Sequence, residues 1–109
     1  MAIGANDEIR SALQALRPEI RSMLAEDLPL DGQRAEAAYA AKEWLALKEH
    51  VHRIKGSASF CRLEALKKAC MRIEEQVADG KPPTQQAMDK FLTEIERIVS
   101  ASVGLSRLP

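Results

Sequence analysis

The segment EWLALKEHVHRIKGSASF, residues 43–60, carries one apolar seam along an otherwise polar stretch. Apolar side chains recur there at alternating steps of three and four residues, which places them on one face of an α-helix. Gly56 interrupts this pattern, although glycine costs about 1 kcal/mol relative to alanine inside a helix. The sequence therefore predicts an amphipathic helix and a functional reason for Gly56. The seam consists of Trp44, Leu47, Val51, Ile54, Ala58 and Cys61.

The two segments that follow repeat this spacing. One covers residues 63–79 and stops at ADGKPP, where Gly80 can cap a helix and Pro82 and Pro83 prevent its continuation. The other begins at Thr84, whose hydroxyl suits a helix N-cap. We expect two more amphipathic helices. Their apolar positions are Leu63, Leu66, Cys70, Ile73 and Val77 in the first, and Met88, Phe91, Ile95, Ile98 and Ser102 in the second.

Prolines and glycines divide the sequence before residue 43. A first helical segment, capped by Asn6 or Asp7, reaches Pro18, which kinks or restarts the helix. The stretch LPLDGQ, residues 28–33, predicts a break, and a short alanine-rich helix follows at about residues 31–41. The apolar positions of this part are Ile9, Leu13, Leu16, Ile20, Met23, Leu24 and Leu28.

Long amphipathic segments joined by short connections favour antiparallel neighbours. No window alternates apolar and polar residues as a half-buried strand would, and only 4% of the residues are aromatic. We therefore expect an all-α protein: an antiparallel up-down four-helix bundle with an additional short N-terminal helical segment. It would form one domain over residues 1–109, with frayed ends at 1–6 and 103–109.

Charge and composition narrow the function classes. Sixteen basic side chains balance sixteen acidic ones, so no global field attracts nucleic acid or a membrane surface. No apolar stretch approaches the roughly 20 residues of a membrane span, and the N-terminus lacks the order of a signal peptide. We expect a cytoplasmic monomer. Cys61 and Cys70 both fall in apolar stripes, which predicts buried thiols rather than a disulfide.

One strip of the 43–60 helix differs from its seam. At about 100° per residue, Leu45, Lys48, Lys55, Gly56 and Ser59 all lie within about 60° of His52, and the seam is centred about 130° away. His52 should therefore stand on the flank of the bundle, in solvent. His50 falls almost opposite His52, and we interpret it as an ordinary histidine at the edge of the seam.

The strip suits transfer of a phosphoryl group to nitrogen. Neutral imidazole is a good nucleophile near pH 7, and Lys55, with Lys48 at longer reach, can stabilise the negative charge of the group in transfer. Gly56 leaves the approach to His52 open. In an antiparallel hairpin whose turn is centred at residue 63, Glu74 lies level with His52, where it can accept the Nδ1 proton and leave Nε2 free.

These residues resemble the histidine-containing phosphotransfer (HPt) domain of bacterial phosphorelays. His52, Ile54, Lys55, Gly56 and Ser57 match the family's H-x-[LI]-K-G-[SA] core. The similarity extends over about residues 18–100, including a tryptophan eight positions before the histidine. Further matching positions are Leu66, Cys70, Ile73 and Glu74.

The resemblance implies a four-helix bundle whose histidine accepts a phosphoryl group from an aspartyl phosphate on a receiver domain and passes it to another receiver. His52 would be the phosphorylation site, Lys55 the cation beside the phosphate, Gly56 the residue that admits the partner, and Glu74 the group that orients the ring. The chain itself would need no cofactor or metal, with Mg²⁺ expected on the receiver. We expect the receiver to contact Leu45, Lys48 and Ser59.

The sequence departs from the family pattern at three positions. Many members have glycines seven and ten residues after the histidine, where this chain has Ser59 and Arg62. Those substitutions should alter how the hairpin turns and how closely a receiver packs. Some members carry a basic or polar side chain where this chain has Ala78. We expect Lys48 to substitute for that side chain.

Three other functions can be weighed against this one. A metal site from His50, His52 and Cys61 is disfavoured because the two histidines diverge on one helix. A kinase is disfavoured because the sequence lacks a glycine-rich nucleotide loop, so we expect a phosphocarrier and not an enzyme. A regulatory module that binds a signalling partner without phosphotransfer stays open. Whether the chain is a free-standing protein or the cytoplasmic C-terminal domain of a membrane-bound hybrid sensor kinase also stays open.

Overall fold

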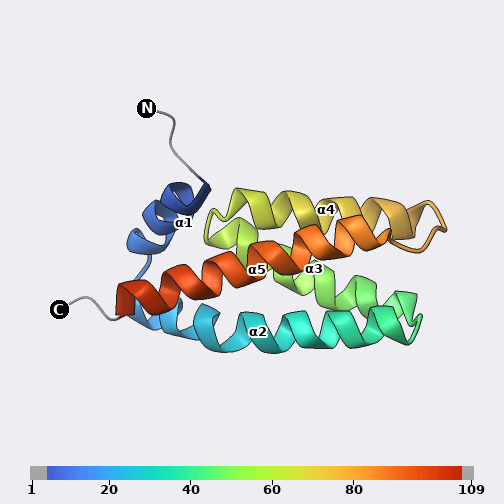
Figure 1. The fold of residues 1–109 in the computed structure, drawn as a ribbon, viewed down its shortest axis with the longest axis horizontal. Helices are drawn as coiled ribbons and strands as arrows, with labels where there is room; N and C mark the ends of the chain where they lie inside the picture. The colour runs from blue at the N-terminus through green and yellow to red at the C-terminus, as the bar shows by residue number, and fades with distance from the viewer. Residues whose placement is uncertain (1–4, 107–109) are drawn as a thin grey trace.

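The computed structural model describes residues 5–106, and this part of the chain is helical without strands. Helices α2 to α5 form an antiparallel up-and-down bundle, and the shorter α1 lies across one end of it (Figure 1). The predicted fold class is confirmed. The bounds are Ala5–Gln14 for α1, Pro18–Ala40 for α2, Trp44–Phe60 for α3, Glu64–Ala78 for α4 and Gln85–Ser106 for α5.

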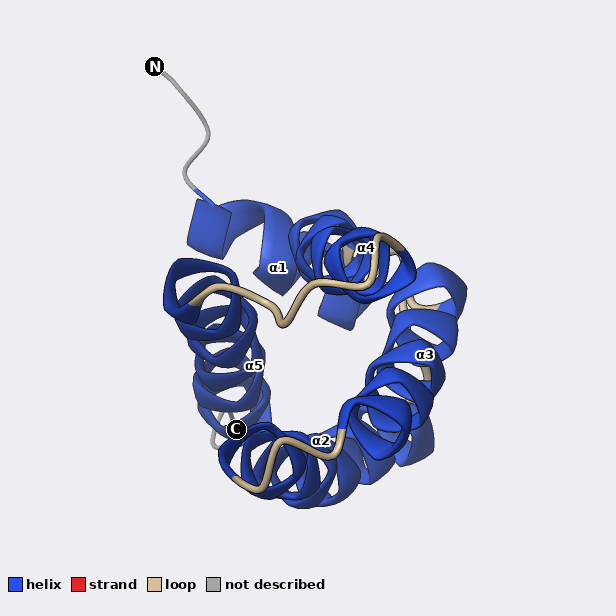
Figure 2. Ribbon diagram, turned by 90° about the vertical axis from the view of Figure 1, so that its right-hand side faces the viewer, coloured by secondary structure: helices blue, strands red, loops and turns tan. Residues whose placement is uncertain are grey.

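The four long helices enclose a single core. Viewed along the bundle, α2 packs against α3 and α5, and α4 packs against the same two helices, so the four form a ring (Figure 2). Helix α1 packs against α5. The seams predicted for α3, α4 and α5 face the core, where Val51, Cys70 and Phe91 are completely buried. In α2, Met23 was one of the expected apolar positions, but it does not face the core and is 54% exposed.

Helix α2 corrects one prediction. It runs without a break from Pro18 to Ala40, so the expected break at residues 28–33 and the separate helix at 31–41 are wrong. Pro29 lies inside this helix, although an interior proline costs about 3 kcal/mol. Buried residues continue on both sides of it, and a Cβ built on Gly32 would lie 3.1 Å from Ile95 Cδ1 of α5. Packing against the bundle thus outweighs the local breaking signals.

The helix starts are only partly as predicted. Pro18 restarts the chain as the first residue of α2, and Thr84 Oγ1 accepts a hydrogen bond from the Ala87 N–H at 3.1 Å, as expected of an N-cap. Helix α1, however, already includes Ala5, so Asn6 and Asp7 lie within the helix and not before it.

Helices α1 and α5 extend further towards the ends of the chain than expected. Helix α5 continues to Ser106, although fraying was predicted from residue 103. Residues 5 and 6, also expected to fray, belong to α1. The rest of the predicted frayed ends, residues 1–4 and 107–109, lies outside the described residues.

Three helices end in the same backbone pattern, in which one residue with positive φ follows the helix. This residue is Lys42 after α2, Arg62 after α3 and Gly80 after α4, with φ of 59°, 59° and 74°. After α4, the Gly80 N–H donates to Val77 O and the Lys81 N–H donates to Gln76 O, both at 3.0 Å. This is a Schellman motif, which confirms the predicted cap at Gly80.

Candidate functional site

His52 projects from α3 into solvent, and its side chain is 70% exposed. The helix is fixed by its opposite face, where Leu47, Val51 and Ile54 are buried in the core. Gly56, one turn further along, is exposed, and a Cβ built there would have no atom within 4 Å. The imidazole therefore has open space on the side facing Gly56, as the sequence predicted.

Glu74 of α4 faces the imidazole from the neighbouring helix. Its Oε2 lies 3.5 Å from His52 Nδ1, in agreement with the pairing predicted from the hairpin. This distance exceeds that of a well-formed hydrogen bond, about 2.7–3.2 Å. With Nδ1 turned towards the carboxylate, Nε2 is on the far side of the ring from Glu74.

Lys55 lies closer to Glu74 than His52 does. Its Nζ lies 2.9 Å from Glu74 Oε1, and the lysine and glutamate side chains are 28% and 18% exposed. The structure therefore brings together His52, Lys55 and Glu74. The contact between Lys55 and Glu74 is an ion pair by distance, but its angles are not those of a hydrogen bond, and Glu74 Oε1 accepts none among the described residues. The sequence predicted that Lys55 stabilises phosphate but did not predict this ion pair.

Cys70 lies beneath the site, one turn before Glu74 on α4. Burial, and secondarily the negative charge of Glu74, raise the pKa of the Cys70 thiol to about 12, although the Lys55 charge opposes the rise. Burial also raises the pKa of Cys61. Both cysteines are free and buried, as predicted, so the site stands on an apolar and chemically inert base.

The residues expected to contact a partner are all on the surface of α3. Leu45 is 72% exposed, and Lys48 and Ser59 are exposed as well. Leu45 and Lys48 border a shallow depression that also reaches His52.

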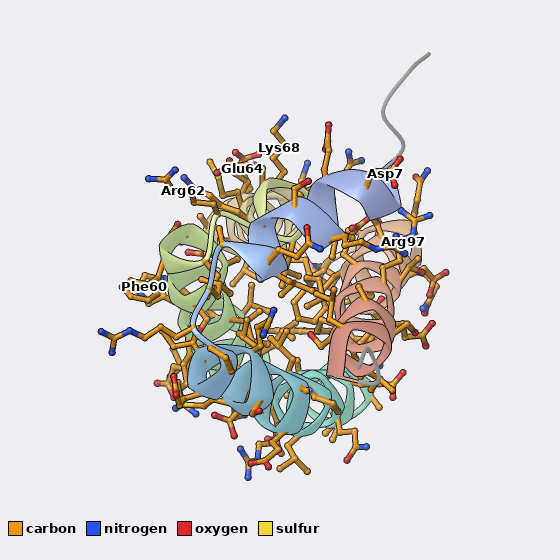
Figure 3. The ribbon with its side chains drawn as sticks, turned by 90° about the vertical axis from the view of Figure 1, so that its left-hand side faces the viewer. Asp7, Phe60, Arg62, Glu64, Lys68 and Arg97 are labelled. Carbon is orange, nitrogen blue, oxygen red and sulfur yellow. The ribbon has the colours of Figure 1, made fainter. Side chains whose placement is uncertain are left out.

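The sequence analysis missed an apolar groove on the other side of His52, between α2 and α3. Its lining includes Met23 and Phe60, which are 54% and 73% exposed. Phe60 projects away from the bundle at the end of α3 (Figure 3). The groove has a volume of about 550 Å³ and also includes Gly56. A signal was present for Phe60, because its position on the helical wheel is about 150° from the seam, whereas Met23 was counted among the apolar positions of its segment and gave no such signal.

The residues of the alternative metal site lie apart in this geometry. Among residues 5–106, no three His, Cys, Asp or Glu side chains gather closely enough to hold a metal ion. His50 is half-buried at the edge of the seam, as predicted, while His52 points to solvent and Cys61 is buried. No helix in this part of the chain has the length and apolar character needed to span a membrane.

A four-helix bundle that presents an exposed histidine beside a lysine and a carboxylate is an arrangement suited to phosphotransfer. The chain belongs to the Hpt domain family, whose sequence model matches residues 19–107. Hpt domains are phosphocarrier modules of two-component signalling, so family membership gives the chain a phosphotransfer role in a phosphorelay. Helix α1 lies outside the matched region.

Two curated relatives are sensor proteins. The Sensor protein GacS of Pseudomonas syringae pv. syringae is 30% identical over 84 residues, which are 74% of this chain and 9% of that protein. The Sensor histidine kinase GacS of Pseudomonas protegens is 31% identical over 85 residues, 78% of this chain and 9% of that protein. The chain thus spans only 9% of the length of these relatives. No solved structure matches it.

Proposed function

We propose that His52 accepts a phosphoryl group from the aspartyl phosphate of one receiver domain and passes it to another. The observation that carries this proposal is the exposed imidazole, with Nδ1 facing Glu74 and Nε2 turned away from it, next to Gly56, where a Cβ would meet no atom within 4 Å. A receiver can approach Nε2 directly, because no side chain of Gly56 blocks the way.

The reaction needs no base from this chain. The Nε2 lone pair attacks phosphorus, the N–P bond forms, and the P–O bond to the receiver's aspartate breaks, so that the aspartate leaves as a carboxylate. The proton stays on Nδ1, and the ring becomes positively charged. Glu74 stabilises that charge, since its Oε2 is already 3.5 Å from Nδ1. The receiver is expected to supply Mg²⁺, which neutralises phosphoryl oxygens on its side.

The surface around His52 is the docking face in this proposal. A receiver that brings its aspartyl phosphate to Nε2 covers about 800 Å² of this chain if the interface is of standard size. Such an area includes Leu45 and Lys48 on one side of His52 and Phe60 and Met23 on the other. Lys48 and Arg53 line the depression next to the histidine together with Glu49, so its charged lining is positive on balance, which complements the acidic pocket of a receiver.

The test is to incubate the chain with a panel of receiver domains carrying ³²P-labelled aspartyl phosphate. We expect an acid-labile, base-stable label on the wild-type chain, none on His52→Gln, and full labelling of the matched control His50→Gln. Glutamine keeps the polar surface but cannot carry phosphate. Label that persists in His52→Gln contradicts the site assignment. A wild-type chain that binds receivers but takes no label would instead be a regulatory binding module.

A further inference from the structure

Glu74 stands between two groups that phosphorylation would affect. One carboxylate oxygen lies 2.9 Å from Lys55 Nζ, and the other lies 3.5 Å from His52 Nδ1. Before phosphorylation, the carboxylate thus has a close contact with the lysine and only a loose one with the ring. A phosphoryl group on Nε2 adds a charge of about −1.5 to −2 within reach of the same lysine.

We propose that Glu74 is a positioning residue that pairs with Lys55 before phosphorylation, and that phosphorylation of His52 makes Lys55 and Glu74 exchange partners. This inference rests on the proposed function. Lys55 leaves the carboxylate for the phosphoryl oxygens, and Glu74 closes on Nδ1–H of the ring, which has become positive. No proton moves, and no bond changes besides the N–P and P–O bonds of the transfer itself.

The exchange has a measurable consequence for the stability of phosphohistidine. Lys55 must break its contact with Glu74 before it can stabilise the phosphoryl group, so part of its contribution is lost. The pair is mostly shielded from solvent, with exposed fractions of 28% and 18%, and is therefore screened less than a fully exposed ion pair. Lys55 should accordingly favour phosphohistidine more strongly when Glu74 carries no charge.

A double-mutant cycle tests this coupling. The fraction of phosphohistidine at equilibrium with a phosphorylated receiver is measured for wild type, Lys55→Met, Glu74→Gln and the double variant. We expect the loss caused by Lys55→Met to be about two- to fivefold larger in the Glu74→Gln background. Lys48→Met is the matched control, because Lys48 has no ion pair with Glu74, and its loss should be the same in both backgrounds.

A second measurement needs no phosphotransfer. The ammonium group of Lys55, observed by ¹H–¹⁵N NMR at low temperature, should show slowed proton exchange in the wild type and in His52→Gln, and fast exchange in Glu74→Gln. A slowed Lys55 signal that survives Glu74→Gln overturns the inference. The inference is also overturned if Lys55→Met lowers the fraction of phosphohistidine equally in both backgrounds while His52 is labelled normally. Absence of label on wild type overturns the proposed function instead.

Discussion

Arg62 and Gly80 end consecutive helices with the same backbone pattern. The Arg62 N–H donates to Ser59 O at 3.3 Å and the Leu63 N–H to Ala58 O at 2.8 Å, which repeats the pattern around Gly80. The φ angles are 59° at Arg62 and 74° at Gly80. Residue 62 is also a position where many Hpt domains have glycine, so this chain makes a turn with positive φ there without the residue best suited to it.

Replacing Arg62 with glycine should therefore stabilise the fold. A non-glycine residue at positive φ costs about 1–2 kcal/mol, and the greater freedom of glycine in the unfolded chain offsets about half of the gain. We expect the free energy of unfolding of Arg62→Gly to rise by about 0.5–1 kcal/mol, measured by urea denaturation. Gly80→Ala, the opposite change at an equivalent position, should lower it. A lower urea midpoint for Arg62→Gly would contradict this reading of the turn.

Gly56→Gln should raise the stability of the fold and slow phosphotransfer to His52. Because a Cβ at this position would meet no atom within 4 Å, the substitution should stabilise the helix by about 0.5–1 kcal/mol. Transfer to His52 should slow by roughly tenfold, since the partner's approach is obstructed. Thermal unfolding and rates of labelling measure the two effects. Gly104→Gln is the control: Gly104 is also unobstructed in α5, and its substitution should leave transfer unchanged. Unaltered transfer in Gly56→Gln would remove the reason given for this glycine.

Phe60→Ala should weaken receiver binding without affecting the fold. The Phe60 side chain is 73% exposed, so the free energy of unfolding should change by less than about 0.5 kcal/mol. An aromatic anchor in an interface is commonly worth more than 1 kcal/mol, so the Kd for a receiver should rise by about fivefold or more. Isothermal titration calorimetry measures the Kd. Val103→Ala, at an exposed apolar position of α5, serves as the control. Equal affinity of wild type and Phe60→Ala would show that the groove is not part of the docking face.

Cys70 should make the fold sensitive to alkaline pH. Its pKa rises from 9.0 to about 12 on folding, so the neutral thiol is the form that the folded state favours. The resulting stabilisation is complete below pH 9 and is lost as the pH rises towards 12. Urea midpoints between pH 8 and about 11 should fall more steeply for wild type than for Cys70→Ala. Parallel pH profiles would show that the thiol is not shielded from water in the folded protein.

The sequence predicted most of the bundle because periodicity reports which face of a helix is buried. It also predicted that Glu74 lies opposite His52, because an antiparallel hairpin with a known turn fixes which residues are level. Both predictions needed only the local helix geometry and one short connection.

The predictions failed where tertiary packing decides. Pro29 and Gly32 are local breaking signals, yet the contact of Gly32 with Ile95 depends on a helix far along the chain. The direction of the Lys55 side chain likewise depends on α4. Neither of these contacts between helices leaves a periodic signal in the sequence.

The 70% exposure of the His52 side chain also affects how long a phosphorylated His52 would persist. A phosphoryl group on its outer nitrogen would stand in bulk water, because the described residues leave most of the imidazole uncovered. Its lifetime would then follow from the intrinsic chemistry of the P–N bond and the few charges beside it. The interval during which a signal survives between donor and recipient would thus depend on how soon the next receiver arrives.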